Sequence, residues 1–166
     1  MASRSVALNH LEDRIRVHTM DLKDAPDRLG HSAFDAVLCN PPYGKRGGAL
    51  RNPRDELAIA RHEIATDLAA VVRSAAALLR NGGRFFLIHQ ADRLPEIARR
   101  LHEAGAPLKR VRLVHTSLER RAHLVLCEAV RFAGEGCIVL PPLLLQDAQG
   151  RPSQELLRIY QGERTV

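Results

Sequence analysis

The segment Phe34–Tyr43 carries the residues whose types and spacing are best suited to chemistry. It reads FDAVLCNPPY, an apolar run that ends at Asn40, Pro41, Pro42 and Tyr43. Because neither proline has an N–H group and each fixes φ, a central strand cannot continue, and the backbone must leave the sheet after Asn40. The pattern therefore predicts an asparagine and prolyl carbonyls at the carboxyl end of a strand, the edge where open α/β sheets bind ligands.

These groups suit the transfer of a methyl group to a planar nitrogen. The exocyclic amine of adenine, or an amide nitrogen, is a poor nucleophile because its lone pair is delocalised. Acceptors that bind both of its hydrogens draw the nitrogen toward a tetrahedral geometry, which frees the lone pair to attack the methyl group of a sulfonium donor. The Asn40 side chain and a carbonyl that precedes a proline supply such acceptors, and Tyr43 would stack on the flat substrate with about 1–3 kcal/mol. A loop exit without chemistry is the alternative, since Pro and Asn are common in loops.

A basic segment follows the tyrosine and could cover a nucleic-acid substrate. Its cations are Lys45, Arg46, Arg51 and Arg54. The segment lacks the Lys-Ser/Thr pair of a phosphate loop. A solvated surface loop is an equally good interpretation.

The other candidate groups are less specific. Asp21 follows the alternating residues 15–20 and could contact a ligand at the same sheet edge or cap a turn. The eight histidines show no metal-ligand spacing, so no metal site is predicted, and His62 is expected to have a helix-surface or packing role. His89 and His115 stand at predicted strand ends, and the sequence does not decide whether they face the site or cap the sheet.

Strands alternate with helices along the chain, which predicts an α/β fold with a mostly parallel sheet. Continuous apolar runs at 34–39 and 84–89 predict strands that are covered on both faces. Between them, apolar residues recur at helical spacing over 64–79, and the Asn-Gly-Gly sequence at 81–83 predicts the left-handed end of that helix. The alternating residues 15–20 predict a half-exposed strand.

The second half of the chain predicts a helix followed by two strands. The helix is expected to run from a cap at Asp92 to Gly105. The segment 110–113 alternates, which favours an edge strand, while 124–130 is almost continuously apolar, which favours an interior strand. The charged link 119–121 predicts a hairpin, and hence antiparallel pairing of the two strands.

Composition limits the class of protein. The 166 residues suffice for one sizeable core. We expect residues 1–135 to form a partial domain and residues 136–166 an extended tail packed on it. The 25 Lys and Arg against 19 Asp and Glu give a net charge of +6, which permits a nucleic-acid partner without requiring one. The three cysteines lack ligand spacing and no apolar run approaches bilayer length, so we expect a reducing, cytoplasmic location without membrane contact.

Several segments together resemble one known family. They are Val6–Asp21, Asn40–Tyr43, Ala60–Glu63, Val114–His115 and Leu140–Leu143. The chain resembles, over nearly its whole length, the valine-tRNA adenine-N6 methyltransferases, which are class I S-adenosylmethionine-dependent enzymes. The Asn-Pro-Pro-Tyr sequence is shared with DNA adenine methylases, other RNA adenine methylases and the glutamine-N5 methylases of release factors, so it indicates the chemistry better than the substrate.

The resemblance implies roles for particular residues. Asn40 and Pro41 would hold the target amine within a catalytic group completed by Pro42 and Tyr43, and Tyr43 would stack on the base. Asp21 and Leu22, with Asn40 nearby, would contact the adenine of S-adenosylmethionine. The substrate would be tRNA or another structured RNA, held by the basic segment.

The resemblance also implies what the fold would contain. The family has a Rossmann-like sheet in the strand order 3-2-1-4-5-7-6, mostly parallel with a C-terminal antiparallel hairpin. On this alignment the chain begins inside the helix after strand 2, so residues 15–20 would be strand 3 and residues 35–39 strand 4. The first two strands, with their glycine-rich turn and acidic residue for the donor, would be lacking.

The missing strands affect the expected behaviour of the chain. We expect a fragment, or a product read from an internal start, that alone binds the donor weakly and self-associates through an exposed sheet edge. The first strand could instead slip beside strand 4, or a second chain could supply the pairing. A protein glutamine-N5 methyltransferase and a non-catalytic remnant that binds RNA remain the alternative functions.

Overall fold

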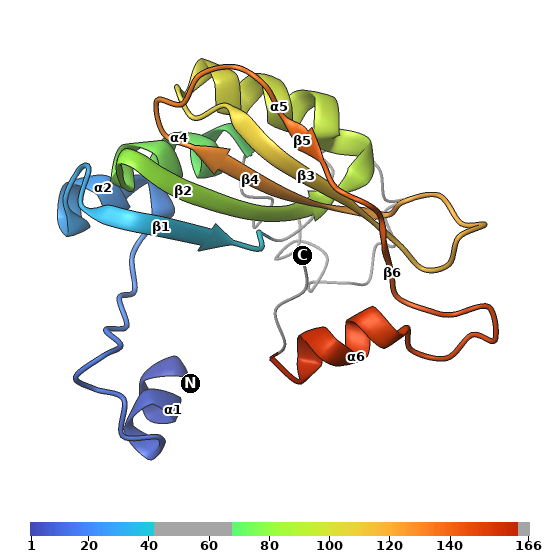
Figure 1. Cartoon of the computed structure of the whole chain (residues 1–166). Coiled ribbons are helices and arrows are strands. Elements are labelled where there is room, and N and C mark those ends of the chain that lie inside the picture. Colours follow the sequence, from blue (N-terminus) through green and yellow to red (C-terminus); the bar gives the residue numbers. More distant parts are fainter. Residues whose placement is uncertain (42–67, 163–166) are drawn as a thin grey trace, which may run out of the picture.

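The computed structural model describes residues 1–41 and 68–162. A mixed sheet of six strands has the order β1-β2-β4-β3-β5, and β6 also pairs with β3 (Figure 1). The strands are β1 (Phe34–Cys39), β2 (Leu79–Gln90), β3 (Leu108–His115), β4 (Leu124–Val130), β5 (Ile138–Val139) and β6 (Leu143–Leu144). The helices are α1 (Ala2–Leu8), α2 (Ala25–Leu29), α4 (Leu68–Leu78), α5 (Leu94–Glu103) and α6 (Gln154–Tyr160), with short 3-10 turns η1 (Leu22–Asp24) and η2 (Ala91–Arg93).

The order of the four long strands is the one expected for strands 4, 5, 7 and 6 of the family. β1 and β2 run parallel, and β4 lies antiparallel between β2 and β3. The predicted hairpin and the interior position of β4 are therefore confirmed, as is the Rossmann-like fold class. The side chains of β4 alternate between buried and half-buried positions, as suits a strand paired on both sides.

The helices α4 and α5 cover one face of the sheet (Figure 1). Their core residues pack with alternate residues of the three central strands. The largest fully buried side chains are Phe85, Leu68, Leu79, Ile97, Leu101, Val71, Val72 and Val125. This packing orients β2, because it fixes which of its side chains face the helices and which face the opposite side.

The predicted end of α4 at the Asn-Gly-Gly sequence is wrong by a few residues, because β2 begins at Leu79 and contains that sequence. The helix ends at Leu78, and Gly82 has φ of 74°, a left-handed conformation that favours glycine. A Cβ atom on Gly83 would lie 2.9 Å from the Arg80 carbonyl oxygen and 3.1 Å from that of Phe34, so β1 and the start of β2 approach too closely for a side chain there. The expected first turn of this helix, residues 64–67, lies outside the described residues.

The start of α5 differs from the prediction. The helix begins at Leu94 with Arg93 at the N-cap and no side-chain cap, because η2 occupies residues 91–93, including the expected cap Asp92. Pro95 stands in the first turn, where its missing N–H costs nothing. Arg93 instead donates to Glu96 at 2.7 Å.

The prediction that β3 lies at the edge of the sheet is wrong. The short strands β5 and β6 of the tail pair with β3 in parallel, Arg110 with Ile138 and Val114 with Leu143. A strand that alternates in sequence is typical of an edge, but it can equally have one face toward solvent while its backbone is paired on both sides.

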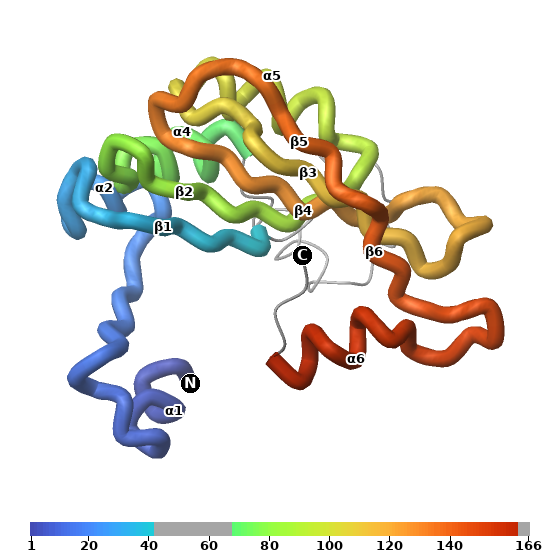
Figure 2. The backbone as a smooth tube through the Cα atoms, viewed as in Figure 1, coloured from blue at the N-terminus to red at the C-terminus, as the bar shows by residue number. Residues whose placement is uncertain are grey.

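The predicted strand at residues 15–20 is not formed. These residues form no strand pairing, and Ile15 and Val17 are more than two-fifths exposed, in a segment that joins α1 to η1 away from the sheet (Figure 2). A strand needs a neighbouring backbone to satisfy its polar groups, and in the described part of the chain none lies beside it. The alternative slip beside β1 does not occur either.

β1 is correspondingly less covered than its apolar sequence predicted. It pairs with β2 alone, and most of its side chains are exposed, Leu38 by 77%. Val37 and Cys39 pack against the core on the helix-covered face, whereas Leu38 lies on the other face. The prediction of burial on both faces is wrong because no strand or helix of the described residues covers that second side.

In the described residues, no helix has the length and apolar character needed to cross a bilayer.

Candidate functional site

The carboxyl ends of β1, β2 and β3 lie along one edge of the sheet (Figure 1). The parallel register pairs Cys39 with Leu87, so Asn40 and Pro41 follow β1 where Ile88 and His89 end β2. Asn40 is exposed and Pro41 is buried. The structure therefore has the predicted asparagine at the carboxyl end of a strand, with its following proline anchored.

The remaining residues of the predicted catalytic and RNA-binding groups lie outside the described residues. They are Pro42, Tyr43, Lys45, Arg46, Arg51 and Arg54. Their roles stay predictions. The helix-surface or packing role expected for His62 stays a prediction for the same reason.

Asp21 and Leu22 form a second group, at the start of η1. The Oδ1 atom of Asp21 accepts the Lys23 backbone N–H at 2.9 Å and so caps this turn, as the structural alternative expected. Its Oδ2 atom accepts no hydrogen bond from the residues that the structure describes, and the side chain is exposed. Leu22 is half-buried against the core. The pair thus offers one open carboxylate oxygen beside an apolar surface, which fits the edge and face of an adenine ring.

His89 is the buried polar residue of this edge that the sequence left undecided. Its exposed fraction is 2%, and its Nδ1 accepts the backbone N–H of Gln90 at 2.8 Å. In a neutral ring this bond places the proton on Nε2. Burial lowers the pKa of His89, and the nearby Arg93 guanidinium acts in the same direction, so the ring is neutral at pH 7. The sequence signal is the alternation Phe85, Leu87, His89, which assigns all three to the helix-covered face.

His115 has a different role at the end of β3. Its Nδ1 lies 2.7 Å from the carbonyl oxygen of Arg120, to which the ring N–H donates. The bond closes the loop between β3 and β4. The sequence left open whether His115 faces the site or caps the sheet, and the structure supports the capping role.

The cysteines supply no activated thiol. Burial raises the pKa of Cys39, the neighbour of Asn40, and raises the pKa of Cys127 to about 12. Within residues 1–41 and 68–162, no group of three or more His, Cys, Asp or Glu side chains could hold a metal ion. The chemistry of this edge is therefore that of amide, carbonyl, carboxylate and imidazole groups.

Solved structures similar to this one are methyltransferases. A predicted O-methyltransferase from Agrobacterium tumefaciens aligns over 99% of this chain and 74% of its own, with a TM-score of 0.72 and 20% identity. The 1,6-didemethyltoxoflavin-N1-methyltransferase of Burkholderia thailandensis, solved with S-adenosylhomocysteine, aligns over 78% of this chain and 56% of its own, with a TM-score of 0.52 and 15% identity. The chain has the class I methyltransferase fold.

The similarity in sequence is more specific. The tRNA1(Val) (adenine(37)-N6)-methyltransferase of Phocaeicola vulgatus is 30% identical over 138 residues, which are 83% of this chain and 56% of that protein. The expected resemblance to the valine-tRNA adenine-N6 methyltransferases is thereby confirmed. This chain spans about half the length of that relative. No family model matches the chain.

Proposed function

We propose that this protein transfers a methyl group from S-adenosylmethionine to N6 of an adenine in tRNA. The observation that carries the proposal is the position of Asn40 and Pro41, directly after β1 at the carboxyl edge of a sheet with the class I methyltransferase strand order. The similarity to a tRNA1(Val) adenine-N6 methyltransferase supports adenine in tRNA as the acceptor. A tRNA substrate would place the enzyme in the cytoplasm.

The residues of the chain would act on the target amine by positioning it. The Asn40 side-chain oxygen and the Pro41 carbonyl accept its two hydrogens, and Pro42 holds that carbonyl in place because its ring restricts the preceding residue. As the nitrogen becomes tetrahedral these bonds strengthen, so they lower the barrier to transfer. Tyr43 stacks on the base and orients its plane. The alkylated nitrogen releases its proton to water.

S-Adenosylmethionine supplies a methyl group on a sulfonium, whose S–CH3 electrons remain on sulfur when the N–CH3 bond forms. Asp21 and Leu22 would hold the adenine end of this donor, since their open Oδ2 atom and half-buried side chain fit a ring edge and a ring face. Asn40 would contact the donor as well as the target amine. The basic residues Lys45, Arg46, Arg51 and Arg54 would contact phosphates of the RNA.

The test is methyl transfer from tritiated donor to unmodified tRNA by the complete gene product. Wild-type protein should label the RNA, and nuclease digestion should release N6-methyladenosine. The Asn40→Ala variant should lose transfer while it still binds tRNA. Label that appeared only in a protein fraction would favour the glutamine-N5 alternative, and RNA binding without any label would favour the non-catalytic one. Either result would refute the proposal.

A further inference from the structure

A groove of about 630 Å³ opens between the loop that joins β3 to β4 and the C-terminal tail. Thr116, Arg120, Arg121 and His123 line it from the loop, and Gln146 lines it from the tail. The groove lies beyond the carboxyl end of β3, which is the edge of the sheet that also carries Asn40 (Figure 1). None of these side chains belongs to the proposed catalytic group.

Backbone hydrogen bonds hold the two walls of this groove in place. On the tail side, the N–H groups of Leu145 and Gln146 donate to the carbonyls of His115 and Thr116, each at 2.9 Å. On the loop side, the His115 ring closes on the Arg120 carbonyl at 2.7 Å. The groove is therefore formed before any ligand arrives, which reduces the entropy that a ligand must overcome.

Two carboxylates also line the groove, those of Asp147 and Glu119, and both already accept hydrogen bonds. Asp147 accepts the backbone N–H groups of Gln149 and Arg151, each at 2.9 Å, and pairs with the Arg151 guanidinium at 3.0 Å. The backbone N–H of Arg151 is the main cause that lowers the pKa of Asp147. Glu119 accepts the Ser117 hydroxyl at 3.0 Å.

Two cations of the groove are less engaged. The pKa of Glu119 is lowered mainly by a backbone N–H, then by the Ser117 hydroxyl and by the nearby charge of Arg120. Arg120 and Arg121 are exposed and form no ion pair within the described part of the chain. Several arginines elsewhere in the described residues, by contrast, pair with carboxylates, for example Arg84 with Glu128 at 2.9 Å. Two neighbouring guanidinium groups that form no ion pair with the described residues, beside hydroxyl, amide and imidazole groups, form a surface suited to phosphate oxygens.

The distance to the reacting position also suits a nucleic acid. In the order β1-β2-β4-β3, three steps of about 4.8 Å separate β1 from β3, or about 14 Å. One strand of a duplex carries a phosphate every 3.4 Å or so, which makes this span about four nucleotides. An RNA strand whose target base lay at Asn40 would thus bring its flanking phosphates to the groove.

We propose that the groove between the β3–β4 loop and the tail binds the RNA backbone beside the target nucleotide, with Arg120 and Arg121 on its phosphates. The inference rests on the proposed function, because it takes RNA as the substrate. It adds a docking surface at the end of β3 that is independent of the basic segment after Tyr43. The contacts are to phosphates, so they contribute affinity and orientation and not base choice.

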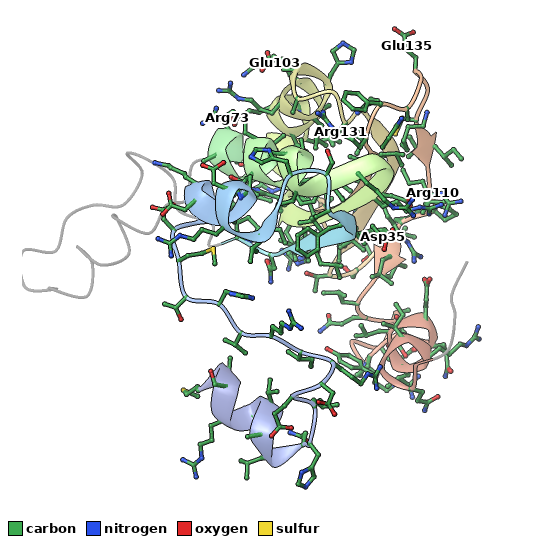
Figure 3. The ribbon with its side chains drawn as sticks, turned by 90° about the vertical axis from the view of Figure 1, so that its left-hand side faces the viewer. Asp35, Arg73, Glu103, Arg110, Arg131 and Glu135 are labelled. Carbon is green, nitrogen blue, oxygen red and sulfur yellow. The ribbon has the colours of Figure 1, made fainter. Side chains whose placement is uncertain are left out.

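The test is tRNA binding by the Arg120→Gln/Arg121→Gln variant, measured by fluorescence anisotropy at several KCl concentrations. Losing two phosphate contacts should lower the slope of log K against log[KCl] by about 1.4 to 1.8. The matched control is Arg28→Gln/Arg73→Gln, which removes the same charge from two exposed arginines, of α2 and α4, that form no ion pair among the described residues. Arg73 is labelled in Figure 3. The slope of the control variant should change by less than about half a unit. Thermal melting should be the same for both variants.

The outcomes separate this inference from the proposed function. An unchanged slope in the groove variant, or an equal change in the control, would overturn the inference, whatever the methyl-transfer assay shows. At saturating tRNA the groove variant should keep wild-type turnover, because its contacts act in binding. A wild-type protein that labels no tRNA, but whose tRNA binding depends on Arg120 and Arg121, would refute the proposed methylation and leave the groove as an RNA-binding surface.

Discussion

Arg112 holds the C-terminal tail against the sheet through two hydrogen bonds, and its replacement by methionine should weaken the docking of that tail. From β3, its Nε donates to the Pro141 carbonyl at 2.9 Å and its Nη2 to Glu155 Oε1 at 2.6 Å. The side chain of Arg112 is 12% exposed and that of Glu155 33% exposed. Methionine would keep much of the apolar stem while it removed both donors.

The magnitude follows from these two bonds. A hydrogen bond to a charged group contributes about 1.5–3 kcal/mol. Since Glu155 keeps a third of its surface in water, we expect the lower part of that range, a total loss of about 2–3 kcal/mol in the free energy of docking the tail. If the loss is transmitted to global unfolding, Tm should fall by about 4–12 °C for a chain of this size.

Hydrogen exchange at the amides of β5 and β6 measures the effect directly, with thermal melting as the global readout. Arg99→Met is the matched control, because Arg99 pairs with Glu103 at the same 2.6 Å but with side chains 54% and 49% exposed. That pair should contribute no more than about 0.5 kcal/mol. Equal effects of the two substitutions would refute the reasoning that burial decides the contribution of each ion pair.

Two further predictions concern the buried His89 of β2 and the edge strand β1. Burial lowers the pKa of folded His89, so its contribution to the free energy of unfolding is complete above the unfolded pKa of about 6.5 and is lost as pH falls through the folded pKa. Urea unfolding should therefore show a smaller loss of stability between pH 7 and 5 in His89→Gln than in wild type. Parallel pH profiles of the two proteins would contradict this. Leu38 lies exposed on the edge strand β1, and Leu38→Lys should reduce the self-association that we expect through that edge, as measured by sedimentation. A wild-type protein that stays monomeric at high concentration would argue against such association.

The parts of the fold that the sequence predicted well are those whose patterns depend on burial in one core. The apolar run of β4 and the helical periodicity before Gly82 each specify an element and its place, because many buried side chains must agree. The residues 15–20 show the limit of such a pattern, since alternation describes a strand but does not supply the neighbour that it needs. The tail strands β5 and β6 have two residues each, too few to leave a period in the sequence.

The candidate site divides in the same way. The prolines after Asn40 fix where β1 must end, so the position of that asparagine could be read from the sequence. The state of His89 could not, because it depends on a hydrogen bond from Gln90 and on burial by helix packing. The groove at Arg120 and Arg121 also escaped sequence analysis, since its second wall comes from a tail some 25 residues further along the chain.

The central claim is that Asn40 binds the target amine as it becomes tetrahedral, and single-turnover methyl transfer by the complete gene product tests it most directly. Asn40→Ala, compared with wild type at saturating tRNA and donor, should lower the rate by at least about 10² to 10³, as the loss of an acceptor used mainly in the transition state would. The tRNA dissociation constant should change by less than about twofold, and Asn81→Ala, at an exposed position near the start of β2, should leave the rate unchanged. A rate for Asn40→Ala close to that of wild type would contradict the account.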